Sequence, residues 1–256
     1  MSAEAIIKSQ ARNILKHNFV KAIIALAILT LPLTIIDGTT TITSFAVINL
    51  VSDEATANIL VYVIGYPIEI IMGFLFSPII NGYIRAFYRA AYSNTIDLRD
   101  VFYYFNVSHY IHALSLNIRL AIRMLLPVLL CYLPLITFDI ISSHIGADFT
   151  ESTLSHNLRF LLTVLSTVLV VLWSIRYFTV FTVSIDNEQL TPQQVFAYNK
   201  YIMQNRSGNV IKLLVSFIPW MLLCLLVLPM LYVIPYMTQS LCVSAKWTTK
   251  AAIEVN

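Results

Sequence analysis

Charged side chains are scarce in this sequence. Only 11% of the 256 residues are Asp, Glu, Lys or Arg, whereas 58% are hydrophobic and the mean hydropathy is +0.78. Soluble domains carry roughly 25% charged residues, so this composition excludes an ordinary soluble fold. Apolar stretches recur along the chain, and an apolar helix of about 20 residues crosses the hydrocarbon core of a bilayer.

Cysteines and catalytic motifs are also scarce. The three cysteines, Cys131, Cys224 and Cys242, lie in apolar stretches, and we interpret them as small buried side chains rather than as a disulfide framework. The sequence contains no phosphate-binding Gly-rich loop, nucleophile elbow or zinc motif, and no two cysteines are closely spaced. We therefore expect a non-enzymatic protein without a metal or other cofactor. A membrane-embedded lipid enzyme is the least favoured alternative.

Basic residues are sorted along the chain, whereas acidic residues are not. A single threading through a membrane places all 16 Lys and Arg residues except Arg159 on one side. The 13 acidic residues divide evenly between the two sides, with Glu69 inside a span. Such sorting of basic residues alone is the positive-inside pattern. It predicts that both termini are cytoplasmic, and it makes anionic lipids a better expected partner than nucleic acid.

The apolar stretches predict an all-α, polytopic transmembrane helical bundle that forms one integral membrane domain over residues 1–256. The last apolar stretch, residues 209–245, is too long for one crossing, so we expect a helical hairpin with Pro229 as its hinge. About six spans are expected, at residues 19–36, 59–81, 117–138, 158–178, 210–228 and 230–245. The segment between the first two spans is expected to be an outer loop.

Three polar segments have amphipathic patterns and are expected to lie as interfacial helices on the cytoplasmic side: residues 3–17, 93–116 and 191–205. The third has the clearest start signal. Thr191, Pro192 and Gln194 have the spacing of an N-cap, a first-turn proline and a capping-box partner.

Glu69 is the sharpest candidate site because it falls near the middle of the second predicted span, between Pro67 and Gly73. An ionised carboxylate there costs about 2.5–3.5 kcal/mol on insertion scales, so such a residue is a candidate ion or proton site. A protonated Glu hydrogen-bonded to a neighbouring helix is the structural alternative. Arg123 is the nearest expected counter-charge by depth.

Prolines and glycines interrupt the same predicted span. Pro67, Gly73, Pro78 and Gly82 could break the helix, as in transporters, and free its backbone groups for a substrate. A kinked helix that packs closely against its neighbours at its glycines is the favoured interpretation.

Four arginines near the inner ends of the second and third predicted spans, Arg85, Arg89, Arg119 and Arg123, are candidate contacts for anionic lipid headgroups. Topology anchoring is the simpler interpretation of the same residues. His109 and His112 could share a helical face, but no further metal ligand lies near them in sequence. Asp139, His144, Asp148 and His156 flank an outer loop, which we expect to be solvated rather than to bind metal.

Several short motifs resemble one protein family. The segment Ser216-Phe217-Ile218-Pro219-Trp220 is followed by Pro235-Tyr236, and similar matches occur at Lys8, Ala11, Arg12 and Leu15, at Ser77-Pro78, Gly82 and Tyr83, at Val101, Phe102 and Phe105, and at Asp186-Asn187, Met203 and Gly208. On these residues the chain resembles the bacterial membrane protein family catalogued as domain of unknown function 975. The resemblance implies a multi-span protein of the bacterial plasma membrane and supplies no activity. Pro219 stands where the family usually has Gly, so the fifth helix is expected to kink.

Two functions remain open from the sequence. The first is a membrane-organising protein or an accessory subunit of a membrane complex, which the collar of basic and aromatic residues on the inner side favours. Its expected partners are the lipid bilayer, anionic lipids and another membrane protein. The second is a small secondary transporter or channel that uses Glu69.

Overall fold

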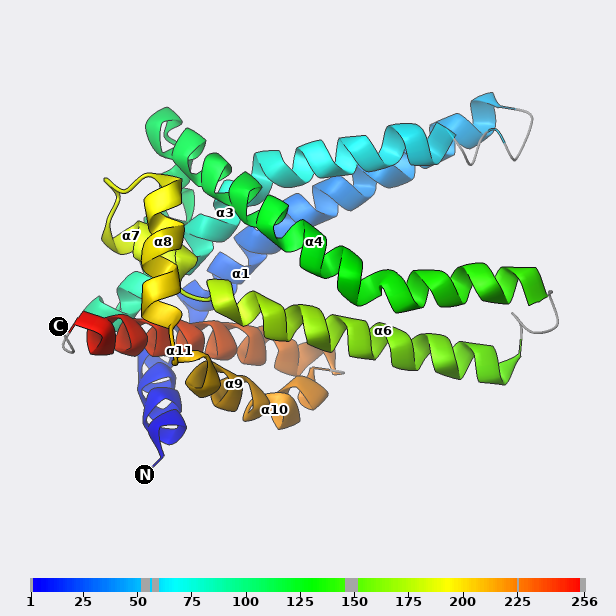
Figure 1. Cartoon of the computed structure of the whole chain (residues 1–256). Coiled ribbons are helices and arrows are strands. Elements are labelled where there is room, and N and C mark those ends of the chain that lie inside the picture. Colours follow the sequence, from blue (N-terminus) through cyan, green and yellow to red (C-terminus); the bar gives the residue numbers. More distant parts are fainter. Residues whose placement is uncertain (1, 52–55, 57–59, 146–151, 225, 254–256) are drawn as a thin grey trace.

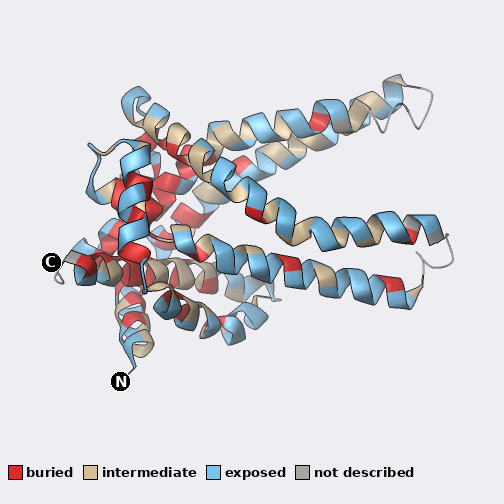
Figure 2. Ribbon diagram, in the orientation of Figure 1, coloured by how far each residue is buried: buried red, intermediate tan, exposed pale blue. Residues whose placement is uncertain are grey.

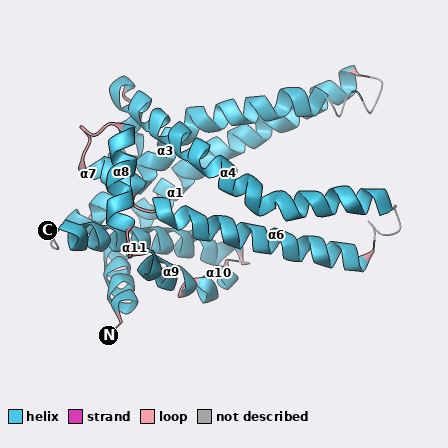
Figure 3. Cartoon of the chain, viewed as in Figure 1, coloured by secondary structure: helices cyan, strands magenta, loops and turns pink. Residues whose placement is uncertain are grey.

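Every regular element that the structure describes is a helix, so the predicted all-α class is confirmed. The structure is a computed structural model, and it describes residues 2–51, 56, 60–145, 152–224 and 226–253. Short loops join the helices (Figure 3). Asp53 and Glu54, in the expected outer loop, and Asp148 and Glu151, in the next one, lie outside the described residues.

Long apolar helices dominate the molecule. They are α1 (Ala3–Leu50), α3 (Tyr66–Ser93), α4 (Val107–Ile145) and α6 (Thr153–Ser174). By length and composition, four helices of the described chain could cross a membrane, at Ala3–Asn49, Val63–Ser93, Val107–Ser142 and Thr153–Asp186. Their apolar side chains are largely exposed, as in Leu126 and Phe160, at 65% and 71% (Figure 2). Exposed apolar surface of this extent suits contact with lipid.

Most of the shorter elements gather at one end of the long helices, where both termini also lie (Figure 1). We call this end the cap; it consists of the first half of α1, the second half of α3, the 3₁₀-helix η2 (Leu98–Phe105), α7 (Val180–Asp186), α8 (Pro192–Met203) and α11 (Val227–Ile253). A π-helical turn η1 (Val61–Gly65) precedes α3, and a 3₁₀ turn η3 (Ile175–Tyr177) follows α6.

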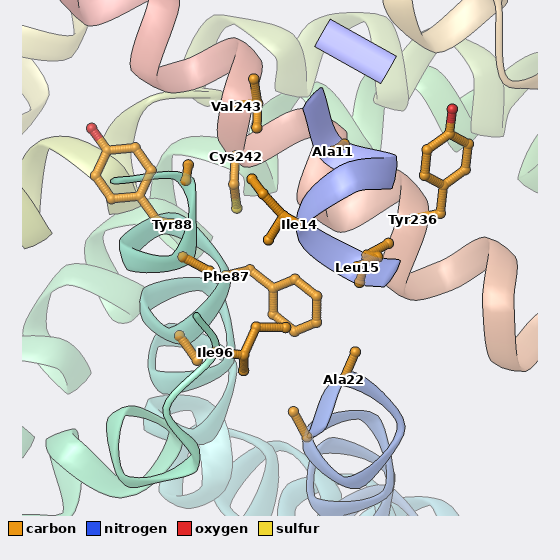
Figure 4. Packing of buried hydrophobic residues seen from close by; sticks show 14 of the residues in the cluster. Ala11, Ile14, Leu15, Ala22, Phe87, Tyr88, Ile96, Tyr236, Cys242 and Val243 are labelled. Carbon is orange, nitrogen blue, oxygen red and sulfur yellow. The ribbon is translucent and has the colours of Figure 1, made fainter. Parts of the chain in front are cut away.

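The largest hydrophobic core lies in the cap. Ile14 and Leu15 of α1 pack with Phe87 of α3 and with Tyr236 and Val243 of α11, and all five side chains are at most 3% exposed (Figure 4). Figure 2 shows the buried residues concentrated here, whereas the far halves of the long helices are mostly exposed. The cap is therefore the part of the chain that packs against itself as a soluble domain does.

Helix α1 combines the first predicted amphipathic segment with the first predicted span, and it bends where they meet. Asn18 has non-helical backbone angles (φ −125°, ψ 18°) and is buried. Its amide nitrogen donates to the carbonyls of Ile14 and Asn94, at 2.9 and 2.8 Å, and its side-chain oxygen accepts from the N–H of Ile96. Asn18 thereby joins the bend to the turn that follows α3.

The expected outer loop after residue 36 is wrong in its first part, because α1 continues to Leu50 and includes Asp37. The hydroxyls of Thr39, Thr41 and Thr43 donate to the backbone carbonyls four residues before them, at 2.8 to 2.9 Å. Threonine can satisfy its hydroxyl inside a helix in this way, so the polar stretch does not end α1.

The predicted linker helix over residues 93–116 is also only partly right. The Asp97 side chain accepts from the Arg99 N–H and starts η2, and the extended backbone at Asn106 ends it. From Val107 onward the chain already belongs to α4. The third predicted element begins as expected: Thr191 and Gln194 form the capping box of α8.

The apolar stretch from residue 209 folds back on itself, as predicted, but its breaks differ from the expected hinge. Helix α9 (Ser207–Val215) gives way to α10 (Ile218–Leu223), whose first turn contains Pro219. Pro229 lies inside the first turn of α11, where proline is tolerated, so it is not the hinge. Six spans are not confirmed, because four helices of the described chain meet the length and composition of a span.

Candidate functional site

Glu69 lies in the first turn of α3, directly after the π-helical turn η1. Its Oε1 atom accepts a hydrogen bond of 2.8 Å from the Thr40 hydroxyl on α1, and the residue is partly buried. Thr40 is thus the hydrogen-bond partner on a neighbouring helix that the structural alternative for Glu69 requires. The expected counter-charge is elsewhere: Arg123 stacks on the Phe196 ring of α8, with its guanidinium carbon 3.7 Å from the ring centroid.

Helix α3 is not broken at its prolines and glycines. It runs from Tyr66 to Ser93 with Pro78 inside it and Pro67 in its first turn. A Cβ atom added at Gly82 would overlap the backbone carbonyl of Val101 in η2, whereas none would meet a neighbour at Gly73. The favoured interpretation, close packing at a glycine, is therefore right for Gly82, and it does not hold for Gly73.

Arg85 is the centre of a charged cluster in the cap rather than an exposed lipid contact. The residue is 6% exposed; its Nε atom lies 3.3 Å from Asp100 and its Nη1 atom 2.6 Å from Glu188. The guanidinium also lies over the Tyr103 ring, 3.5 Å from the centroid. An arginine whose donors face two carboxylates and an aromatic ring has a structural role.

Glu188 shows the electrostatic effect of this cluster. Burial alone would raise the pKa of its carboxyl group, but hydrogen bonds from Arg85 and from the Tyr103 hydroxyl outweigh burial and lower the pKa below its usual 4.5. Glu188 therefore stays ionised around neutral pH and holds the turn between α7 and α8 against α3.

The remaining predicted arginines have separate environments. Arg89 is more exposed and forms an ion pair of 2.8 Å with the same Asp100 oxygen that Arg85 contacts. Arg119 is partly buried on α4, and Arg123 is exposed on the same helix. The four arginines that the sequence grouped together therefore have different surroundings, and lipid contact by them stays a prediction.

Metal sites are not found in the described residues: no group of three or more His, Cys, Asp or Glu side chains could hold a metal ion there. His109 stacks on Tyr103, and His112 lies 3.3 Å from the Ser184 hydroxyl. Near the outer loop, Asp139 pairs with Arg159, the one basic residue outside the predicted pattern.

Sequence reasoning missed the partners of these side chains. Glu188 is 103 positions from Arg85, and no local pattern links them. Arg176 and Lys200, which line a cavity with Arg123, were also missed. One signal was available in the sequence: no Asp or Glu lies close to Arg123, Arg176 or Lys200. Basic residues that only anchor the topology share this feature, so the signal does not identify a site.

The helices and their exposed apolar side chains define an all-α protein with four helices that suit a membrane. The sequence profile of the family described as "Protein of unknown function (DUF975)" matches residues 1–244, and the chain belongs to this family. The resemblance inferred from the short motifs is thus confirmed. No curated protein and no solved structure matches the chain.

Proposed function

We propose that this protein is a non-enzymatic, membrane-organising protein, or the accessory subunit of a membrane complex, in the bacterial plasma membrane. The observation that supports it is the cap. A well-packed, basic and aromatic body, whose elements the Arg85 cluster joins, lies at one end of helices with exposed apolar side chains. A body of this kind suits contact with headgroups or with a partner on one face of the bilayer.

The proposal includes a six-span topology with both termini cytoplasmic. In addition to the four long helices, the α9–α10 segment and α11 would form a fifth and a sixth membrane helix. Leu222 and Leu228, at 64% and 80% exposed, support lipid contact on this hairpin. The basic residues at the cap end support a cytoplasmic position for the cap.

A transporter or channel is the second candidate, and Glu69 favours it. The carboxylate lies beside a π-helical turn, a feature frequent at functional sites, and faces Thr40 on a second long helix. A protonated Glu69 that only joins α1 to α3 would give the same geometry.

Deletion of the gene followed by complementation separates the two functions. Membrane integrity of the deletion strain, read by uptake of a hydrophobic dye, is expected to be restored equally by the wild type and by Glu69→Gln, because Gln keeps a hydrogen-bonding partner for Thr40. Immunoblots of the membrane fraction control for the level of each variant.

The opposite pattern would favour the transporter. If Glu69→Asp restores the strain and Glu69→Gln does not, at equal protein levels, the carboxylate itself is needed and the membrane-organising proposal is wrong.

A further inference from the structure

A cavity lies at the edge of the cap, between α4, η3, α8 and the first residue of α9. Its volume is about 1010 Å³. Three cationic side chains line it, Arg123, Arg176 and Lys200, together with the neutral polar residues Gln193, Gln204 and Ser207. No Asp or Glu is among the described residues of its lining. The cavity is therefore an electropositive site without an internal counter-charge.

The two arginines are held by aromatic rings and not by carboxylates. Arg123 lies over Phe196, and Arg176 lies over Trp173, 4.2 Å from the ring centroid. Ion pairs within the described part of the chain are made by Arg85, Arg89 and Arg159 instead. An aromatic face fixes the position of a guanidinium while leaving its N–H donors available to an anion.

One wall of the cavity is fixed by Asn199, which is 2% exposed. Its amide nitrogen donates to the Arg176 carbonyl at 2.9 Å, and its side-chain oxygen accepts from the Thr179 hydroxyl at 2.8 Å. These bonds join α8 to the end of η3, so the backbones that carry Arg176 and Lys200 keep a set separation. A site organised before binding loses less free energy when its ligand arrives.

Apolar surface adjoins the cavity. Ile122 and Leu126 of α4 are 66% and 65% exposed, and Trp173 of α6 is 39% exposed. These side chains belong to two of the four helices that suit a membrane; Ile122 is next to Arg123 in sequence, and Leu126 and Trp173 lie about one turn from Arg123 and Arg176, respectively. A ligand that fits both features has a phosphate for the cations and acyl chains for the helices.

We propose that this cavity binds the phosphate of an anionic phospholipid, with the guanidinium groups of Arg123 and Arg176 and the ammonium group of Lys200 facing the phosphate oxygens. The acyl chains lie along α4 and α6. The inference rests on the proposed function and deepens it by naming the ligand class and the residues. A free phosphate would satisfy the cations but would leave the adjoining apolar surface without a partner.

The test is native mass spectrometry of the full-length protein in a neutral detergent, titrated with phosphatidylglycerol or phosphatidylcholine. The wild type is expected to retain phosphatidylglycerol in preference to phosphatidylcholine. Arg123→Gln, Arg176→Gln and Lys200→Gln are each expected to weaken phosphatidylglycerol binding about fivefold, the usual effect of one cation at an anionic surface. Arg99→Gln, an exposed arginine of η2 outside the cavity, is the matched control and should bind as the wild type does.

Two results would overturn the proposal. Binding that is equal in the wild type and in all three cavity variants would show that the lipid binds elsewhere. Displacement of phosphatidylglycerol by inorganic phosphate at equal concentration would identify a soluble phosphate as the ligand.

Lys200→Glu guards against misfolding, because Lys200 is exposed on α8; it should weaken binding more than Lys200→Gln does. Since the assay uses purified protein, its failure with intact complementation in cells would leave the proposed function standing.

Discussion

Arg85 and Asp100 form a buried ion pair that joins α3 to η2 in the cap. Both residues are buried, at 6% and 8% exposed, and Asp100 accepts from Arg85 and Arg89 through the same oxygen. A buried ion pair adds modest net stability, but removal of one partner is costly because the remaining buried charge loses part of its compensation; Arg85 would keep Glu188 alone. Removal of the Asp100 carboxylate is therefore expected to cost more stability than the ion pair itself contributes.

We expect Asp100→Asn to lower the free energy of unfolding by about 1–3 kcal/mol, because Arg85 would keep its ion pair with Glu188 but lose its charged hydrogen-bond partner on η2. Thermal unfolding of the purified protein in detergent measures the change. Asp139→Asn is the matched control: it breaks the ion pair with Arg159, whose side chain is 63% exposed, and should change stability by less than about 1 kcal/mol. Equal effects of the two substitutions would contradict a structural role for the buried cluster.

At the scale of elements, the contact between α3 and η2 depends on one glycine. Gly82 brings the α3 backbone against the Val101 carbonyl, and Val101 is fully buried in the core. This contact also places Tyr103 and Asp100 of η2 beside Arg85, one turn further along α3. The charged cluster therefore depends on the close packing of η2 against α3 at Gly82.

Gly82→Ala is expected to destabilise the protein by about 1–3 kcal/mol, since the added methyl group would force η2 away from α3. Gly73→Ala adds the same group to the same helix where no atom lies within 4 Å, and it should stabilise the helix by about 0.5–1 kcal/mol. Unfolding measurements on the two variants must therefore move in opposite directions. A shift in the same direction would refute the close contact.

At the scale of the whole molecule, the cap and both termini share one end of the long helices (Figure 1). In the proposed topology, the positive-inside pattern predicts that this end is cytoplasmic. Thr95 is exposed in the cap, and Thr153 is exposed at the opposite end, in the first turn of α6. In the proposed topology, these two threonines therefore lie on opposite faces of the membrane.

In a variant with Cys131, Cys224 and Cys242 replaced by Ala, we expect Thr153→Cys to react with a membrane-impermeant maleimide in intact cells. Thr95→Cys should react only after the membrane is permeabilised, because the proposed topology places the cap in the cytoplasm. Labelling yields on both sides of permeabilisation give the measurement. The reverse labelling pattern would place the cap outside and invert the topology.

Much of the helical framework could be predicted from the sequence, whereas most of the site could not. Apolar length predicts the long helices, and Thr191 with Gln194 predicts the start of α8 because a capping box is local. The break before α10 depends partly on a distant residue: Lys8 donates to the Ser216 carbonyl at 2.7 Å across 208 positions. Hydropathy records how apolar a stretch is, but it does not record which backbone group finds a distant partner.

The bend at Asn18 has a consequence for biogenesis. The N-terminal segment leaves the ribosome first, yet Asn18 joins to Asn94 and Ile96, and Ile14 packs in one core with Val243 near the other end of the chain. The first amphipathic segment can therefore reach its final contacts only after the intervening helices have been synthesised. Closure of the cap then becomes a late step of assembly, possible only when almost the whole chain has been synthesised.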